Sequence, residues 1–97
     1  MAARVGQDPA FARALLSESI SLFANGESDV CRLMLRDLVN ATIGFERLAI
    51  EVSKPSKSLH RMLSVRGNPT MDNLVSIISV LRQELKVTTI EVAALPE

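Results

Sequence analysis

The segment of residues 44–70 constrains the fold more than any other part of the chain, because small and apolar residues recur in it at fixed offsets. Two short helices that cross at a steep angle need a small residue at the crossing and apolar residues on either side, so that both helices pack on a third. Five positions have the required type and spacing: Leu48, Ala49, Val52, Leu59 and Met62. We therefore predict a helix-turn-helix over residues 45–63, with Ala49 at the crossing.

The second helix of this pair is expected to follow a turn formed by Val52-Ser53-Lys54 and to run from Pro55 to about Leu63. Pro55 suits its first position, because the missing N–H is no loss there and the fixed φ is already helical. With the apolar residues inward, helical periodicity turns a polar face outward. This face consists of Ser56, Lys57, His60 and, more obliquely, Arg61 and Ser64. A short amphipathic helix whose polar side only faces solvent has the same pattern. Periodicity alone therefore does not distinguish a DNA-reading face from a hydrated one.

Four motifs of this region resemble those of a known family of small regulators. They are Gly44-Phe45-Glu46-Arg47-Leu48-Ala49, Lys57-Ser58-Leu59-His60-Arg61-Met62-Leu63, Gly67-Asn68-Pro69-Thr70 and Asn73-Leu74. On these residues the chain resembles the XRE/HigA-type helix-turn-helix family of addiction-module antidotes and small DNA-binding transcriptional regulators. The resemblance implies an all-α, five-helix, lambda-repressor-like domain. The chain departs from the family at Ser53 and Lys54, where a glycine and an apolar residue are usual, and at Pro55, where a capping serine is common.

These observations predict a sequence-specific regulator, a repressor, that binds double-stranded DNA as a homodimer. We assign base reading to Ser56, Lys57 and His60, since lysine and histidine can donate to base edges. Phosphate contacts are assigned to Lys54, Arg61, Arg66, Asn68, Thr70 and Asn73. Plain helix capping by Thr70 is an equal alternative. The alternative function is an antitoxin that neutralises a cognate toxin protein and autoregulates its operon through DNA binding.

Two further helices are predicted before this region. Asp8 before Pro9 is a start signal, and a helix is expected from Pro9 to about Ala24, with Asn25-Gly26 as its stop. A second helix begins near Glu27 and Asp29, whose charges suit a helix N-terminus. It is expected to end at residues 42–44.

The residues after the helix-turn-helix predict a further helix and a strand. Thr70 can cap a helix whose apolar stripe is Met71, Leu74, Val75, Ile78, Leu81 and Leu85. The methionines Met34, Met62 and Met71 are interpreted as core residues. Residues 85–92 are rich in β-branched side chains and predict a short strand. A lone strand needs a pairing partner, which makes it our candidate for the homodimer contact.

Length and composition favour one small domain over residues 1–97, with residues 1–7 as a flexible N-terminus. No apolar run approaches the about 18 residues of a membrane span, and no signal-peptide core is present, so a cytoplasmic protein without membrane contact is expected. Cys31 is the single cysteine and His60 the single histidine. We therefore expect no enzyme, no metal site and no cofactor, and we interpret Cys31 as a small core residue.

The charged residues are distributed unevenly although the net charge is zero. Residues 44–70 carry five basic and two acidic side chains, a local charge of +3. The basic ones are Arg47, Lys54, Lys57, Arg61 and Arg66. This excess falls where phosphates would be met.

Overall fold

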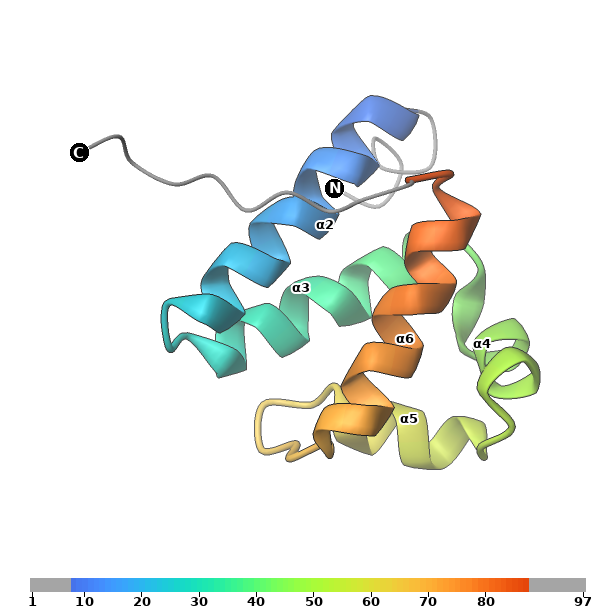
Figure 1. Ribbon diagram of the computed structural model, residues 1–97. Coiled ribbons are helices and arrows are strands. Elements are labelled where there is room, and N and C mark those ends of the chain that lie inside the picture. Colours follow the sequence, from blue (N-terminus) through green and yellow to red (C-terminus); the bar gives the residue numbers. More distant parts are fainter. Residues whose placement is uncertain (1–7, 88–97) are drawn as a thin grey trace.

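The computed structural model describes residues 8–87, which form five α-helices and no strand (Figure 1). The helices are α2 (Pro9–Ala24), α3 (Ser28–Ala41), α4 (Gly44–Val52), α5 (Ser56–Met62) and α6 (Met71–Glu84). In Figure 1, α2 and α3 are joined by a tight turn, α6 passes in front of α3, and α5 lies along the lower edge of the molecule. The predicted all-α class is confirmed for this part of the chain.

Helix α2 begins and ends where the sequence predicts. The Asp8 carboxylate accepts a hydrogen bond from the amide of Phe11 at 3.1 Å, and Pro9 occupies the first turn. Ala12 and Leu16 are fully buried on its inner side, as is Ser19. The Ser19 hydroxyl donates to the Leu16 carbonyl at 2.7 Å, so its burial leaves no unsatisfied polar group.

Three of the helices end in the same way, with a left-handed residue after the last turn. These residues are Gly26 after α2 (φ 85°), Ser53 after α4 (φ 55°) and Lys86 after α6 (φ 57°). In each case the next amide bonds to a carbonyl five residues earlier: Glu27 to Leu22 at 2.8 Å, Lys54 to Ala49 at 3.1 Å, and Val87 to Arg82 at 2.9 Å. This is the Schellman arrangement, in which glycine is usual at the left-handed position. Only Gly26 supplies that glycine among the three.

The strand predicted over residues 85–92 is wrong at its start. Leu85 is the C-cap of α6 and is 8% exposed, so it completes the buried side of the helix. Lys86 then turns the chain in the left-handed conformation, which a strand does not contain. The rest of that prediction, residues 88–92, lies outside the described residues.

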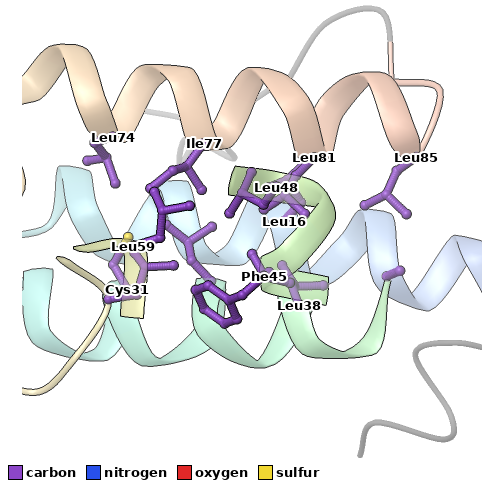
Figure 2. Packing of buried hydrophobic residues seen from close by; sticks show 14 residues of the cluster. Leu16, Cys31, Leu38, Phe45, Leu48, Leu59, Leu74, Ile77, Leu81 and Leu85 are labelled. Atoms are coloured by element: carbon purple, nitrogen blue, oxygen red, sulfur yellow. The ribbon is translucent and has the colours of Figure 1, made fainter. Parts of the chain in front are cut away.

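The core is one cluster to which all five helices contribute (Figure 2). Its buried members are Ala12, Leu16, Cys31, Leu35, Leu38, Val39, Phe45, Leu48, Leu59, Leu63, Leu74, Ile77, Leu81 and Leu85. Leu59 extends from α5 into this cluster (Figure 2). Helix α5 is therefore held on its inner side by the same core that joins the other helices.

The buried side of α6 differs from the predicted stripe. Leu74, Ile77, Leu81 and Leu85 are buried, whereas Met71 and Val75 are 62% and 52% exposed. Leu74, Leu81 and Leu85 belong to both the predicted and the observed stripe, and packing selects the one that contains Ile77. The prediction of Met71 as a core residue is therefore wrong. Within the described chain, no helix combines the length and apolar character needed to cross a membrane.

Candidate nucleic-acid interface

The outward side of α5 carries the three residues predicted to read bases. Lys57 and His60 are exposed, and Ser56 is half-buried in the first turn. The opposite side is anchored by Leu59, which is 1% exposed, and by Leu63 just after the helix, which is fully buried. Because successive helical residues are about 100° apart, the three polar side chains share one face.

His60 is held in place by an aromatic contact that the sequence did not reveal. Its ring stacks on Phe45 of α4, with ring centroids 3.9 Å apart and an interplanar angle of 21°. Phe45 is 5% exposed, so the histidine rests on a ring that the core already fixes. Stacked aromatic pairs of this kind stabilise beyond their buried area. One face of the imidazole is thus covered, while His60 as a whole remains exposed and its nitrogens lie in the plane of the ring.

The turn between α4 and α5 places Lys54 two residues before the start of α5. Ser53 takes the left-handed conformation, and the Lys54 amide closes the turn onto Ala49. Pro55, with φ −62° and ψ 139°, is the N-cap and not the first helical residue, so α5 starts one residue later than predicted. Its carbonyl accepts from the amides of Ser58 and Leu59 at 3.0 and 3.2 Å. Lys54 itself is half-buried.

The exit loop (residues 64–70) carries the next group of predicted phosphate contacts. Arg66 and Asn68 are exposed in this loop, and Arg61 is exposed on the last turn of α5. Gly67 lies close to the end of α5: a Cβ there would meet the Met62 carbonyl oxygen and would lie 2.6 Å from that of Arg61. The loop backbone at Gly67 therefore folds back tightly on the end of α5, and Arg66 precedes this close approach by one residue.

Thr70 caps α6, which is the first of its two predicted roles, helix capping and phosphate contact. Its hydroxyl oxygen accepts from the Asn73 amide at 3.1 Å. Thr70 is exposed and Asn73 is half-buried at the start of α6. A threonine hydroxyl that accepts one hydrogen bond still has a proton to donate. Capping and a phosphate contact are thus chemically compatible at this position.

One basic residue of the local +3 excess is already paired. Arg47 on α4 reaches Glu84 on α6 with both ends of its guanidinium, at 3.0 and 3.4 Å. The two side chains are 56% and 33% exposed, so this ion pair contributes little to stability. It nevertheless neutralises Arg47, which leaves the unpaired positive charge concentrated on the turn, α5 and the exit loop.

Arg32 touches this region although local sequence patterns gave no signal for it. It comes from α3, and its Nε donates to the Ser64 carbonyl at 3.1 Å while Nη2 donates to that of Val65 at 2.8 Å. These partners lie 32 and 33 residues away in the chain. Helical periodicity reports which face a residue occupies, but not which distant carbonyl it meets.

Cys31, beside Arg32, is 1% exposed in the core, as predicted. Burial raises the pKa of its thiol, and the nearby Arg32 guanidinium opposes that rise. A raised pKa keeps the thiol protonated and unreactive. Among residues 8–87, no three potential ligands gather into a site that could hold a metal ion.

The candidate interface is a basic and polar surface over the turn, α5 and the exit loop, and most of its side chains are exposed. Its donors are ammonium, guanidinium, imidazole, amide and hydroxyl groups, which suit phosphate oxygens and base edges. Comparison with known proteins adds no relative: no protein-family model, no curated protein and no solved structure matches this chain.

Proposed function

We propose that this chain is a sequence-specific DNA-binding regulator of transcription, a repressor, in which α4 and α5 form a lambda-repressor-like helix-turn-helix. The observation that carries the proposal is the division of α5 into two sides. Leu59 and Leu63 are buried against the other helices, while Lys57 and His60 are exposed. A reading helix needs this arrangement, because it must be fixed from behind while its polar side enters the major groove.

Base reading is assigned to Lys57, His60 and Ser56. A lysine ammonium can donate to the O6 and N7 acceptors of guanine, and serine can pair with several base edges. His60 donates in the plane of its ring, so its stacking on Phe45 does not block such a contact. The stack also fixes the ring before DNA arrives, which reduces the side-chain entropy lost on binding.

Phosphate binding is assigned to Lys54, Arg61 and Arg66, with Asn68, Thr70 and Asn73 as neutral donors. These residues flank the reading helix at both ends, as contacts that position a helix in a groove usually do. Three cations supply little affinity for one copy. We therefore propose that a homodimer binds two half-sites about one DNA turn apart.

The proposal is tested by selecting duplexes from a random pool with the wild-type chain and measuring binding of the selected operator. We expect the double variant Lys57→Ala/His60→Ala to lose about 2 to 6 kcal/mol of specific binding free energy, since each base contact contributes about 1 to 3 kcal/mol. Arg66→Ala should weaken binding to all duplexes alike, because phosphates carry no sequence information.

A matched control removes a cation far from α5. Arg13 is exposed in the first half of α2. Figure 1 shows the start of α2 at the end of the molecule opposite α5. Arg13→Ala should bind the operator as the wild type does. Equal operator affinity in the wild type and in the Lys57→Ala/His60→Ala variant would refute the assignment of α5 as the reading helix.

A further inference from the structure

The exit loop is tied to the body of the protein by one side chain from α3. Arg32 donates through Nε to the Ser64 carbonyl at 3.1 Å and through Nη2 to the Val65 carbonyl at 2.8 Å. The planar guanidinium presents these donors in a rigid fork, which the single ammonium of a lysine cannot reproduce. Arg32 follows the buried Cys31, so its own backbone is anchored in the core.

Hydrogen bonds within the loop connect the carbonyl held by Arg32 to the turn that contains Arg66. The Ser64 carbonyl that accepts from Arg32 also accepts from the Gly67 amide at 3.0 Å. Arg66 therefore lies inside a short turn of residues 64–67, which is closed by the hydrogen bond from the Gly67 amide to the Ser64 carbonyl. On the other side, the Ser64 hydroxyl donates to the Arg61 carbonyl at 2.7 Å and joins the turn to α5.

The loop is not closely packed against the start of α3 beside Arg32. A cavity of about 120 Å³ lies between the start of α3 and the far end of the loop, and Arg32, Asn68 and Pro69 are among its lining residues. Close-packed side chains would hold a loop by contact alone. Because a cavity lies here instead, the position of the loop depends more on the two hydrogen bonds from Arg32.

We propose that Arg32 is the positioning residue of the phosphate-binding loop and acts on DNA through Arg66, without contacting DNA itself. The inference rests on the proposed function, because it assigns a DNA phosphate to Arg66. With the fork intact, the loop keeps the backbone of Arg66 fixed near the end of α5. Without it, the loop samples other conformations, and the phosphate contact is lost from most of them.

The experiment compares Arg32→Lys, which keeps the charge, with Arg66→Ala and with the combination of the two. We expect Arg32→Lys to weaken binding of operator and unrelated duplexes alike, by about the same factor as Arg66→Ala, and to reduce the salt slope by about 1 per copy. The double variant should bind no more weakly than Arg66→Ala alone, because both changes remove the same contact. Arg36→Lys, a matched change on the same helix, should bind as the wild type does.

A measurement without DNA tests the fork separately from the proposed function. Hydrogen exchange at the Gly67 amide should be faster in Arg32→Lys than in the wild type, while amides of α2 stay protected. Unchanged exchange at Gly67, or an Arg32→Lys effect of equal size with and without Arg66→Ala, would overturn the role of Arg32. A wild-type chain that selects no duplex would instead overturn the proposed function, and the DNA role of Arg32 would fall with it.

Discussion

Ser53 adopts a backbone conformation that is unfavourable for a residue with a Cβ. It occupies the left-handed position after α4 with φ 55°. This conformation costs a residue with a Cβ about 1 to 2 kcal/mol, whereas glycine's larger unfolded freedom costs it about 0.5 to 1 kcal/mol. We expect Ser53→Gly to raise the free energy of unfolding by up to about 1 kcal/mol in urea titrations.

The matched control for this change is the same substitution within a helix. Ser76 is exposed on α6, and Ser76→Gly should lower the free energy of unfolding by about 0.5 kcal/mol through lost helix propensity. If Ser53→Gly is destabilising as well, the left-handed turn is not the conformation of this residue in solution.

Cys31 is expected to be protected from thiol reagents by the fold. Its burial and raised pKa leave little thiolate, so modification by a disulfide reagent should be much slower in the native protein than in urea. Because the folded thiol holds its proton more tightly than the unfolded one, the stabilisation it contributes is complete below the unfolded pKa. It is lost as pH rises through the folded pKa. Native and denatured rates that coincide would contradict this burial.

Single residues also mark the limits of what the sequence could predict about the site. The exposure of Lys57 and His60 and the burial of Leu59 follow from helical periodicity alone, and the structure has them as expected. The stack of His60 on Phe45 depends on how α4 and α5 cross, and the fork of Arg32 depends on how the exit loop approaches α3. No local pattern encodes that approach.

At the scale of elements, we expect the crossing of α4 and α5 to depend on Ala49. It packs against the core on the partly buried side of α4, and its carbonyl closes the turn with the Lys54 amide. A larger side chain would push the helices apart. We expect Ala49→Leu to lower the free energy of unfolding by about 1 to 3 kcal/mol and to abolish operator binding.

The control for this prediction lies one residue further on the same helix. Ile50 is 78% exposed, so Ile50→Leu should leave both stability and operator binding unchanged. An Ala49→Leu variant with the melting temperature and affinity of the wild type would show that the crossing lies elsewhere.

The helices could be predicted from the sequence, but the end of the last one could not. Asp8-Pro9, Asn25-Gly26 and Thr70 are local start and stop signals, and α2 and α6 begin where these signals predict. The end of α6 uses a left-handed lysine, Lys86, which resembles no stop signal. The β-branched residues that follow then favoured a strand beginning at Leu85, a residue that in fact completes the helix.

For the whole molecule, the arrangement of charge predicts how DNA binding depends on salt. Arg47 is neutralised by Glu84, which leaves Lys54, Arg61 and Arg66 as the proposed phosphate contacts of each copy. The logarithm of the binding constant should fall with the logarithm of salt concentration with a slope of about −3 for one bound copy and about −5 for two.

This slope can be measured by titrating the operator between about 50 and 200 mM salt. A slope near −5, together with sedimentation as a dimer, would support two copies on the operator. A slope near −3 on the complete operator would contradict the homodimer.

The stack between His60 and Phe45 also supplies a built-in spectroscopic reporter. His60 is the single histidine, so its carbon-bound ring protons give one set of imidazole resonances in a proton NMR spectrum. The His60 ring is stacked on the Phe45 ring with the two centroids 3.9 Å apart, so the ring current of Phe45 shields these protons. These lines should therefore appear upfield of a free imidazole and return downfield whenever α4 and α5 separate, so that the integrity of the pair can be followed in solution without any label.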